Sequence, residues 1–301
     1  MTGHRRDAPL VGLGVDWQWR RRYAGGLPGL CDRFRPRLSH ISCVSLADGP
    51  AAAEFLRTCA GTLPTIHHLP GVAPAAPEGP DLDLLRRLEA VSDAIGAAWI
   101  CEDIGLWSIG PYPLPYFTPP LLEPDVARHV ARGIRAMATV SRYPFLAEIP
   151  SCTFVAGRMD LGDFFRVLTE DAGCDLVLDV AHVYSYAVTR GTPAPQVLVS
   201  LPLERVVEIH VAGGHVDGRH PSRYIDSHSD PVDPAVLGLL ALAVPDCPRL
   251  RAVTFEIGVG LSPDVIDRDL GRIETTLAPS GWVPSMERSR PRPIPERSAH
   301  E

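Results

Sequence analysis

Short apolar runs, many of them β-branched, recur along the chain, and each is followed by a polar loop and then by a segment with helical periodicity. The apolar runs lie at 11–15, 40–46, 64–69, 97–103, 145–149, 175–180, 205–211 and 252–257. Runs of this length are typical of strands that are buried on both faces of a parallel sheet. Three intervening segments, at 81–95, 123–140 and 159–173, repeat apolar residues at helical spacing instead. Asp160 or Pro124 near a start and Gly173 at an end are the residues expected at helix boundaries.

Eight strands that alternate with helices predict a (β/α)8 TIM barrel, an α/β fold. A doubly wound open sheet is the rival arrangement, because it has the same alternation. We place the barrel in residues 8–284. The segment 105–124 is rich in proline and aromatic residues and is predicted to be a structured loop after the fourth strand. The tail 285–301 is rich in arginine and proline and is predicted to be disordered.

Composition restricts the class of protein. The chain has 301 residues, of which 45% are hydrophobic and 22% charged, as in ordinary soluble domains. No apolar stretch is long enough to cross a membrane and no signal peptide is evident, so we expect a cytoplasmic protein without a membrane partner. The net charge of −7 argues against a nucleic-acid partner, and the chain contains no lysine. Seven dispersed cysteines without a CxxC pair indicate reduced, mostly buried thiols.

Metal-capable side chains end six consecutive predicted strands. They are His67 and His68, Glu102 and Asp103, Glu148, Asp179 with His182 three residues on, His210 with Asp226 and His228 in the loop after it, and Glu256. Taken singly, each is more simply a solvated residue or a helix cap. In a TIM barrel, however, the carboxyl ends of all strands meet at one mouth. So many carboxylates and imidazoles would repel one another or be poorly solvated there unless cations neutralised them, so the joint pattern predicts a metal centre.

The donor types indicate which metals fit. Only Cys101 stands beside these residues at a ligating distance along the chain, so a thiolate site is not expected. Mixed imidazole and carboxylate ligands suit iron, manganese or zinc. The candidates exceed what one ion can use, which favours two or three ions bridged by a carboxylate. Glu148 is the natural bridge, because it lies centrally in the strand order.

Several stretches together resemble one known family. They are HHLPG (67–71), AAWICEDIGLWSIGPYPLPYF (97–117), LAEIPSCTF (146–154), GCDLVLDVAHVYSYA (173–187), RVVEIHVAGGH (205–215), YIDSHSDPV (224–232) and TFEI (254–257). In these stretches the chain resembles the DUF692 (UPF0276) family, multinuclear non-heme iron-dependent oxidative enzymes that are similar to xylose isomerase-like barrels. The combination of IHVAGGH and DSHSDPV after LDVAHVY is the most specific part of the likeness.

The resemblance implies a set of metal ligands. The nine candidates are His68, with His67 as the alternative, Asp103, Glu148, Asp179, His182, His210, Asp226, His228 and Glu256. Among them, Glu148, Asp179 and His210 are the expected catalytic residues. Four positions depart from the family pattern: Asp103 stands where a histidine is expected, Ile149 replaces an asparagine, and Ala181 and His182 replace an asparagine pair. One metal position can therefore be reshaped or lost.

The resemblance also implies a function. We expect two or three iron ions, as Fe2+ and Fe3+, that use O2 to modify a residue, cysteine above all, of a ribosomally synthesised precursor peptide in natural-product biosynthesis. Zinc or manganese remain possible metals, and a separate leader-peptide-recognition protein is a possible partner. Two segments would hold the peptide at the mouth: 71–80, which is predicted to be disordered, and 105–124. Both can equally be ordinary loops. Candidate substrate contacts are His215, which can alternatively be a ligand, and the aromatic residues Trp107, Tyr112, Tyr116 and Phe117.

Two other functions stay open at this point. The first is a non-redox isomerase or phosphodiesterase on the same barrel. Such isomerases usually employ a lysine near the metals, which this chain lacks, and a nuclease would need a basic surface. The second is a non-catalytic scaffold that binds metal or peptide. Asp103 at the expected histidine position is its only support, and the retained array of mutually repelling carboxylates opposes it.

Overall fold

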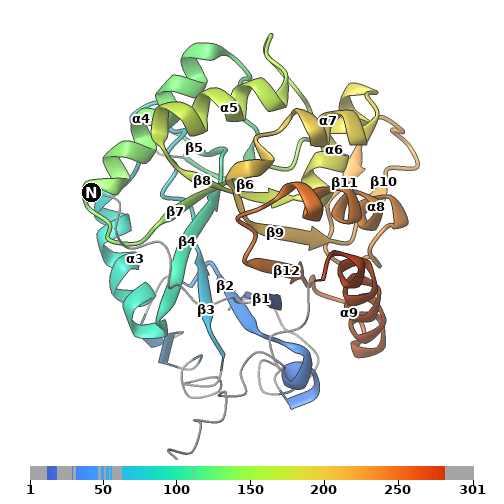
Figure 1. The fold of residues 1–301 in the computed structure, drawn as a ribbon. Coiled ribbons are helices and arrows are strands. Elements are labelled where there is room, and N and C mark those ends of the chain that lie inside the picture. The colour runs from blue at the N-terminus through green and yellow to red at the C-terminus, as the bar shows by residue number, and fades with distance from the viewer. Residues whose placement is uncertain are drawn as a thin grey trace, which may run out of the picture.

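Eight parallel strands close into a barrel at the centre of the molecule (Figure 1). The structure is a computed structural model that describes residues 12–18, 29, 32–46, 49, 50, 52, 53, 55, 63–110 and 112–281. The barrel strands are β1 (Gly12–Gln18), β2 (His40–Val44), β3 (Thr65–His68), β4 (Ala97–Asp103), β7 (Phe145–Glu148), β8 (Asp175–Asp179), β9 (Val206–Ala212) and β12 (Ala252–Glu256). Because β1 pairs with both β2 and β12, the sheet has no edge. The predicted TIM barrel is confirmed, and the rival open sheet is wrong.

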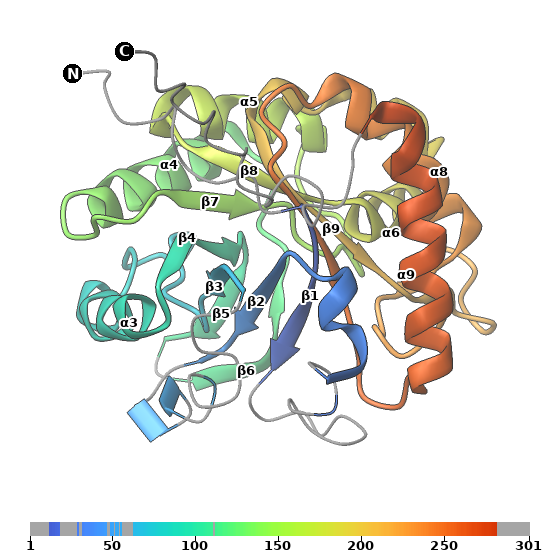
Figure 2. The same cartoon turned by 60° about the horizontal axis from the view of Figure 1, so that its bottom comes forward.

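Helices cover the outside of the barrel (Figures 1 and 2). They are α3 (Leu82–Ile95), α4 (Pro124–Ala138), α5 (Leu161–Ala172), α6 (Val180–Arg190), α7 (Ala194–Ser200), α8 (Pro234–Ala243) and α9 (Pro263–Leu277), with short 3₁₀ turns at Arg35–Arg37, Leu203–Arg205, Val244–Asp246 and Ala278–Ser280. In α3, Leu85, Leu88 and Val91 are buried on one face at helical spacing. The Asp81 side chain caps its first turn by accepting a hydrogen bond from the Leu84 N–H. The apolar face of α3 is thus buried where the helix packs beside β4.

The inside of the barrel changes from apolar to polar along its axis. Ile66, Cys101, Leu146 and Val177 form part of a separate buried cluster. Each precedes a candidate ligand by two positions on its own strand, and residues two apart in a strand share a face. The candidate ligands therefore lie at one end of the barrel, and those on β3, β4, β7 and β8 lie above apolar side chains.

Two loops at this end differ in detail from the sequence-based expectations. The loop 105–124 is structured as predicted and contains a two-stranded hairpin, β5 (Leu106–Ile109) and β6 (Tyr112–Thr118). The segment 71–80, expected to be disordered, is ordered, and its residues 72–76 are buried. The buried Glu102 carboxylate accepts hydrogen bonds from the N–H groups of Val72 (2.7 Å) and Ala73 (2.6 Å), which fixes the segment. A second small hairpin follows β9 and consists of β10 (His215–Val216) and β11 (Tyr224–Ile225).

Other expectations concern thiols, membranes and the tail. The five cysteines in the described part of the chain, at 43, 101, 152, 174 and 247, are free and buried as predicted. No helix among the described residues is both long and apolar enough to cross a membrane. The predicted disordered tail, 285–301, lies outside the described residues.

Candidate metal centre

All nine candidate ligands converge at one end of the barrel and form a continuous cluster. His68 lies between Glu148 (2.7 Å) and Asp103 (3.6 Å), and His210 lies between Glu148 (2.9 Å) and Glu256 (3.4 Å). The cluster continues through His228 and His182 to Asp226 and Asp179. Strand ends supply most of these side chains, because the parallel barrel brings the carboxyl ends of its strands together.

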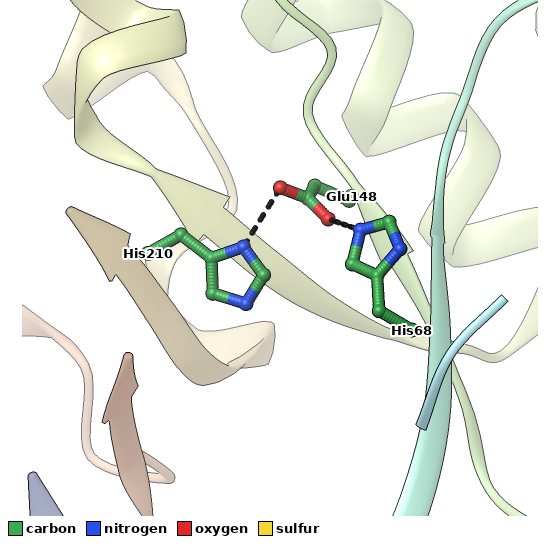
Figure 3. A group of neighbouring side chains, drawn as sticks. All are labelled: His68, Glu148 and His210. Carbon is green, nitrogen blue, oxygen red and sulfur yellow. Dashed lines mark hydrogen bonds and ion pairs between the residues drawn. The ribbon is translucent and has the colours of Figure 1, made fainter. Parts of the chain in front are cut away.

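Glu148, at the end of β7, lies between two histidines from opposite sides of the cluster (Figure 3). Its Oε2 is 2.7 Å from His68 Nε2, and its Oε1 is 2.9 Å from His210 Nδ1. The carboxylate is fully buried, and the two oxygens face different partners. A carboxylate in this geometry can bind two ions, one through each oxygen, as expected of the predicted bridge.

The other side of the cluster is built around His182, in the first turn of α6. Its Nδ1–H donates to the backbone carbonyl of Ile149 (2.7 Å), which leaves Nε2 facing Asp226 (2.9 Å). Asp226 Oδ2 also lies 3.2 Å from His228 Nε2. The main chain of Ile149 therefore orients the side chain of His182.

Asp179 has two roles at once. Its Oδ1 accepts hydrogen bonds from the N–H groups of Ala181 (2.6 Å) and His182 (2.9 Å), and so caps the N-terminus of α6. Its Oδ2 is buried, makes no hydrogen bond, and lies 3.6 Å from His182 Nε2. One oxygen therefore stabilises the helix, and the other is available to the cluster.

The loop that carries Asp226 and His228 is held by two glycines. His228 has a positive φ of 52°, a conformation that costs free energy for a residue with a side chain. Its N–H donates to Gly213 O, and its carbonyl accepts from Gly258 N–H. A Cβ atom at Gly213 would lie 1.8 Å from Asp230 O, and one at Gly258 would lie 2.2 Å from His228 O. Only glycine fits at these two close approaches.

The charged groups of the cluster interact strongly with one another. It combines five carboxylates with four imidazoles, and no arginine in the described part of the chain forms an ion pair with them. Burial alone would lower the pKa of His68, but Glu148 and Asp103 outweigh it and raise the pKa to about 9. In the same way, Asp226 and Glu256 outweigh burial at His228 and raise its pKa to about 10. Burial raises the pKa of Glu256 to about 7, against the effect of His228 and His210.

The residues fit bound cations. Asp103 Oδ1, Asp179 Oδ2 and Asp226 Oδ1 are buried carboxylate oxygens without a hydrogen-bond partner. A buried oxygen of this kind costs free energy unless a proton or a metal ion binds it. In four groups, the possible donor atoms all lie within 4.8 Å of one another, close enough to share one ion. The groups are His68, Glu148 and His210; Asp103, Glu148 and His182; His182, Asp226 and His228; and Asp179, His210 and Glu256. Their oxygen and imidazole donors suit iron, manganese or zinc.

Two of the residues considered from the sequence lie outside the cluster. The alternative ligand His67 is buried on the outer face of β3, where its ring nitrogens contact Ser92 Oγ (2.7 Å) and Leu46 O (2.9 Å). Glu102 faces outward in the same way and binds the segment 71–80. Both lie one position from a candidate ligand, and adjacent residues in a strand point to opposite faces.

The candidate substrate contacts lie around the mouth rather than in the cluster. His215 is exposed on β10, and its Nδ1 lies 2.7 Å from Asp230 Oδ2. Tyr112 is 73% exposed at the turn of the β5–β6 hairpin. Trp107 packs against Phe117 and donates a long hydrogen bond to Asp103 O (3.4 Å). Tyr116 is exposed and stacks on Phe117, with ring centroids 4.4 Å apart.

Sequence reasoning missed two acidic residues. Asp16, near the end of β1, is buried, accepts a hydrogen bond from Ile257 N–H (2.5 Å) and contributes to the raised pKa of His228. The rule applied to the other strand ends would have found it, because Asp16 directly follows the first apolar run, 11–15. Glu208 lies below His210 in the barrel interior. The i, i+2 spacing of Glu208 and His210 on one strand was its only signal.

Comparison with known proteins gives a consistent family and fold. A family model described as "RiPP precursor modification enzyme MbnB/TglH/ChrH" matches residues 41–262, where RiPP denotes a ribosomally synthesised and post-translationally modified peptide. A UPF0276 protein of Rhizorhabdus wittichii is 30% identical over 252 residues, which cover 81% of this chain and 85% of that protein. A UPF0276 protein of Caulobacter vibrioides is 27% identical over 223 residues, which cover 70% and 76%.

Solved structures with the same fold are more distant in sequence. A xylose isomerase domain protein from Planctomyces limnophilus aligns with a TM-score of 0.58 at 14% identity and covers 90% of this chain and 97% of that protein. Endonuclease IV from Thermus thermophilus aligns with a TM-score of 0.56 at 18% identity and covers 89% and 99%. These likenesses identify a xylose isomerase-like TIM barrel.

Proposed function

The chain belongs to the MbnB/TglH/ChrH family of RiPP precursor modification enzymes, and from this membership we propose that it is an O2-dependent, multinuclear iron enzyme that oxidises a residue of a precursor peptide. Cysteine is the residue we propose as the target. O2 is the oxidant in this reaction, and the peptide residue is oxidised. The cluster of five carboxylates and four imidazoles, with three buried carboxylate oxygens that make no hydrogen bond, is the observation that carries the proposal.

We assign the nine candidate ligands to two or three ions. Glu148 would bridge, with its Oε2 beside His68 and its Oε1 beside His210. Asp226 would hold a second position together with His182 and His228. Asp103, in place of the histidine expected there, brings one more negative charge to its position and favours a more highly charged ion. When bound, redox-active iron would supply activation of O2 and a binding position for the substrate thiolate.

The protein residues would orient these groups and restrict water. Ile149 O and the Asp179 cap fix the position of His182 before any ion binds, so the ligands are preorganised. The buried side chains below the cluster, which are apolar on β3, β4, β7 and β8 and polar but hydrogen-bonded on β9 and β12, fill the barrel, so the substrate would approach from the loops. The β5–β6 hairpin and the β10–β11 hairpin stand at that mouth, and Trp107, Tyr112 and His215 remain our proposed peptide contacts.

The test is anaerobic purification followed by metal analysis and Mössbauer spectroscopy. The iron-loaded protein is then exposed to O2 with a cysteine-containing precursor peptide, with and without a leader-recognition protein. We expect two or three irons per chain, O2 consumption, and a change in peptide mass that requires both iron and O2. Zinc as the only bound metal, without O2 consumption, would contradict the proposal.

A non-redox hydrolase is the second candidate. By the resemblance, Asp103 stands in place of a histidine and His182 in place of an asparagine. Carboxylate and imidazole ligands also suit zinc. The fold alone is shared with endonuclease IV. Zinc-loaded protein that cleaves a phosphodiester and leaves peptides unchanged would favour this candidate. The absence of lysine and the net charge of −7 weigh against a nucleic-acid substrate.

A further inference from the structure

A second polar group lies inside the barrel, below the candidate metal ligands. At its centre is Glu208 on β9, which is fully buried and shares the inward face of the strand with His210. Glu208 Oε1 lies 2.6 Å from Thr254 Oγ1 and 3.0 Å from His210 Nε2, and Oε2 lies 2.7 Å from Trp99 Nε1. A buried carboxylate is costly, so its three partners from three strands indicate a specific role.

The hydrogen-bond directions follow from the chemistry of each group. The Trp99 indole can only donate, so Oε2 accepts. Thr254 donates its hydroxyl proton to Oε1 and therefore accepts from His40 Nε2, 2.9 Å away. An ionised carboxylate only accepts, so His210 donates through Nε2–H. All three donors around Glu208 are then satisfied by one carboxylate.

This arrangement decides which nitrogen of His210 faces the cluster. With the proton held on Nε2 by Glu208, the lone pair of a neutral ring lies on Nδ1. Nδ1 is the nitrogen that lies 2.9 Å from Glu148 and 3.4 Å from Glu256 (Figure 3). His68 and His228 instead face their carboxylates through Nε2, so His210 differs from them.

We infer that Glu208 is a positioning residue that fixes His210 in the Nε2–H tautomer, so that His210 binds its metal ion through Nδ1. The inference rests on the metal centre proposed above and adds a residue that no candidate ligand set included. Trp99 and Thr254 hold the Glu208 carboxylate in place. A carboxylate that accepts a hydrogen bond from the second ring nitrogen is a common way for proteins to orient a metal-binding histidine.

Glu208→Gln is the main test. The glutamine amide has the shape of the carboxylate, but its NH2 group donates hydrogen bonds where a carboxylate oxygen accepts them. Trp99 needs an acceptor, so the amide oxygen turns to Trp99 and the NH2 group faces His210. Nε2 must then accept, which moves the ring proton to Nδ1 and blocks the metal. The probe is Zn2+ titrated into metal-free protein, and we expect affinity at one position to fall about 10- to 100-fold.

The double variant Glu208→Gln/Trp99→Phe separates positioning from structural damage. Without the indole N–H, the amide oxygen is free to turn toward His210, so the double variant should recover much of the lost Zn2+ affinity. Glu102→Gln is the matched control, since Glu102 is equally buried but faces the segment 71–80. It should change thermal stability and leave Zn2+ stoichiometry unchanged.

Long-range 1H–15N spectra of histidine-labelled, Zn2+-loaded wild type give a direct reading that does not depend on any variant folding. We expect His210 to carry its proton on Nε2 and bind through Nδ1. Binding through Nε2, unchanged affinity in Glu208→Gln, or a loss that Trp99→Phe does not relieve would overturn the role of Glu208 alone. Wild type that binds no metal would instead overturn the proposed centre together with this inference.

Discussion

His67 and His68 are neighbours in the sequence and have unrelated roles in the structure. His68 joins the cluster beside Glu148, whereas His67 packs against α3 through Ser92. The sequence pattern placed a histidine ligand at this strand end but could not choose between the two. A shift of one residue in strand register exchanges the two faces, and local sequence alone does not fix the register.

These two neighbouring histidines allow a matched test. We expect His68→Gln to lower the metal content measured by mass spectrometry, because a ligand and a Glu148 partner are lost. His67→Gln should retain the metal and lower the free energy of unfolding by about 1–3 kcal/mol, because Ser92 and Leu46 lose a buried partner. Equal metal loss in both variants would show that His68 is not a ligand.

At the scale of elements, the strands were the most predictable part. Each barrel strand is buried on both faces and is therefore a short, continuous apolar run. The segment 71–80 was misjudged because its order depends on Glu102, which is distant in sequence and supplies hydrogen-bond acceptors for Val72 and Ala73. The β5–β6 hairpin was not foreseen, because prolines at 113 and 115 are unusual in strands and are tolerated only at an edge.

The loop that carries Asp226 and His228 gives a test at this scale. In Gly213→Ala, the new methyl group collides with Asp230 O, so we expect the loop to move and the ions near Asp226 to be lost or to bind at least tenfold more weakly. Gly238→Ala is the control, because Gly238 lies in α8 with no atom close to the new methyl group. That change should stabilise the helix by up to about 1 kcal/mol. Metal titration and thermal melting of both variants check the result, and unchanged binding in Gly213→Ala would contradict it.

At the scale of the whole molecule, the closed barrel explains why residues far apart in sequence could be predicted to meet. Once eight parallel strands were expected, their carboxyl ends had to converge. The number of ions could not be predicted in the same way. It depends on distances set by loops and by helix starts, such as His182 in the first turn of α6.

Without metal, the cluster balances its charge with protons, and this predicts a pH dependence. His68 and His228 have folded pKa values of about 9 and 10, above the unfolded value of about 6.5. Their contribution is therefore complete below pH 6.5 and is lost as the pH rises through 9 to 10, on the order of 3 kcal/mol for His68 alone. Glu256, with a pKa of about 7, acts in the same direction, because its protonated form is favoured in the folded state.

The measurement is calorimetry of chelated and metal-loaded protein between pH 6.5 and 10. We expect the melting temperature of the metal-free protein to fall across this range. Metal binding requires deprotonated histidines, so it should strengthen with pH and release protons into the buffer. The stabilisation by metal should therefore grow with pH. A metal-free protein that becomes more stable over the range would refute this account.

The cap of helix α6 helps to decide whether Asp179 serves only the stability of the helix or also binds a cation. Serine, threonine or asparagine at position 179 would cap the helix about as well as aspartate does. None of them would bury a negative charge. Helix stability alone thus gives natural selection no reason to prefer aspartate there, while the second oxygen of Asp179, which the helix does not use, gives it one. A scaffold that does not bind cations would have no use for this charge, so aspartate at this position supports the proposed metal centre.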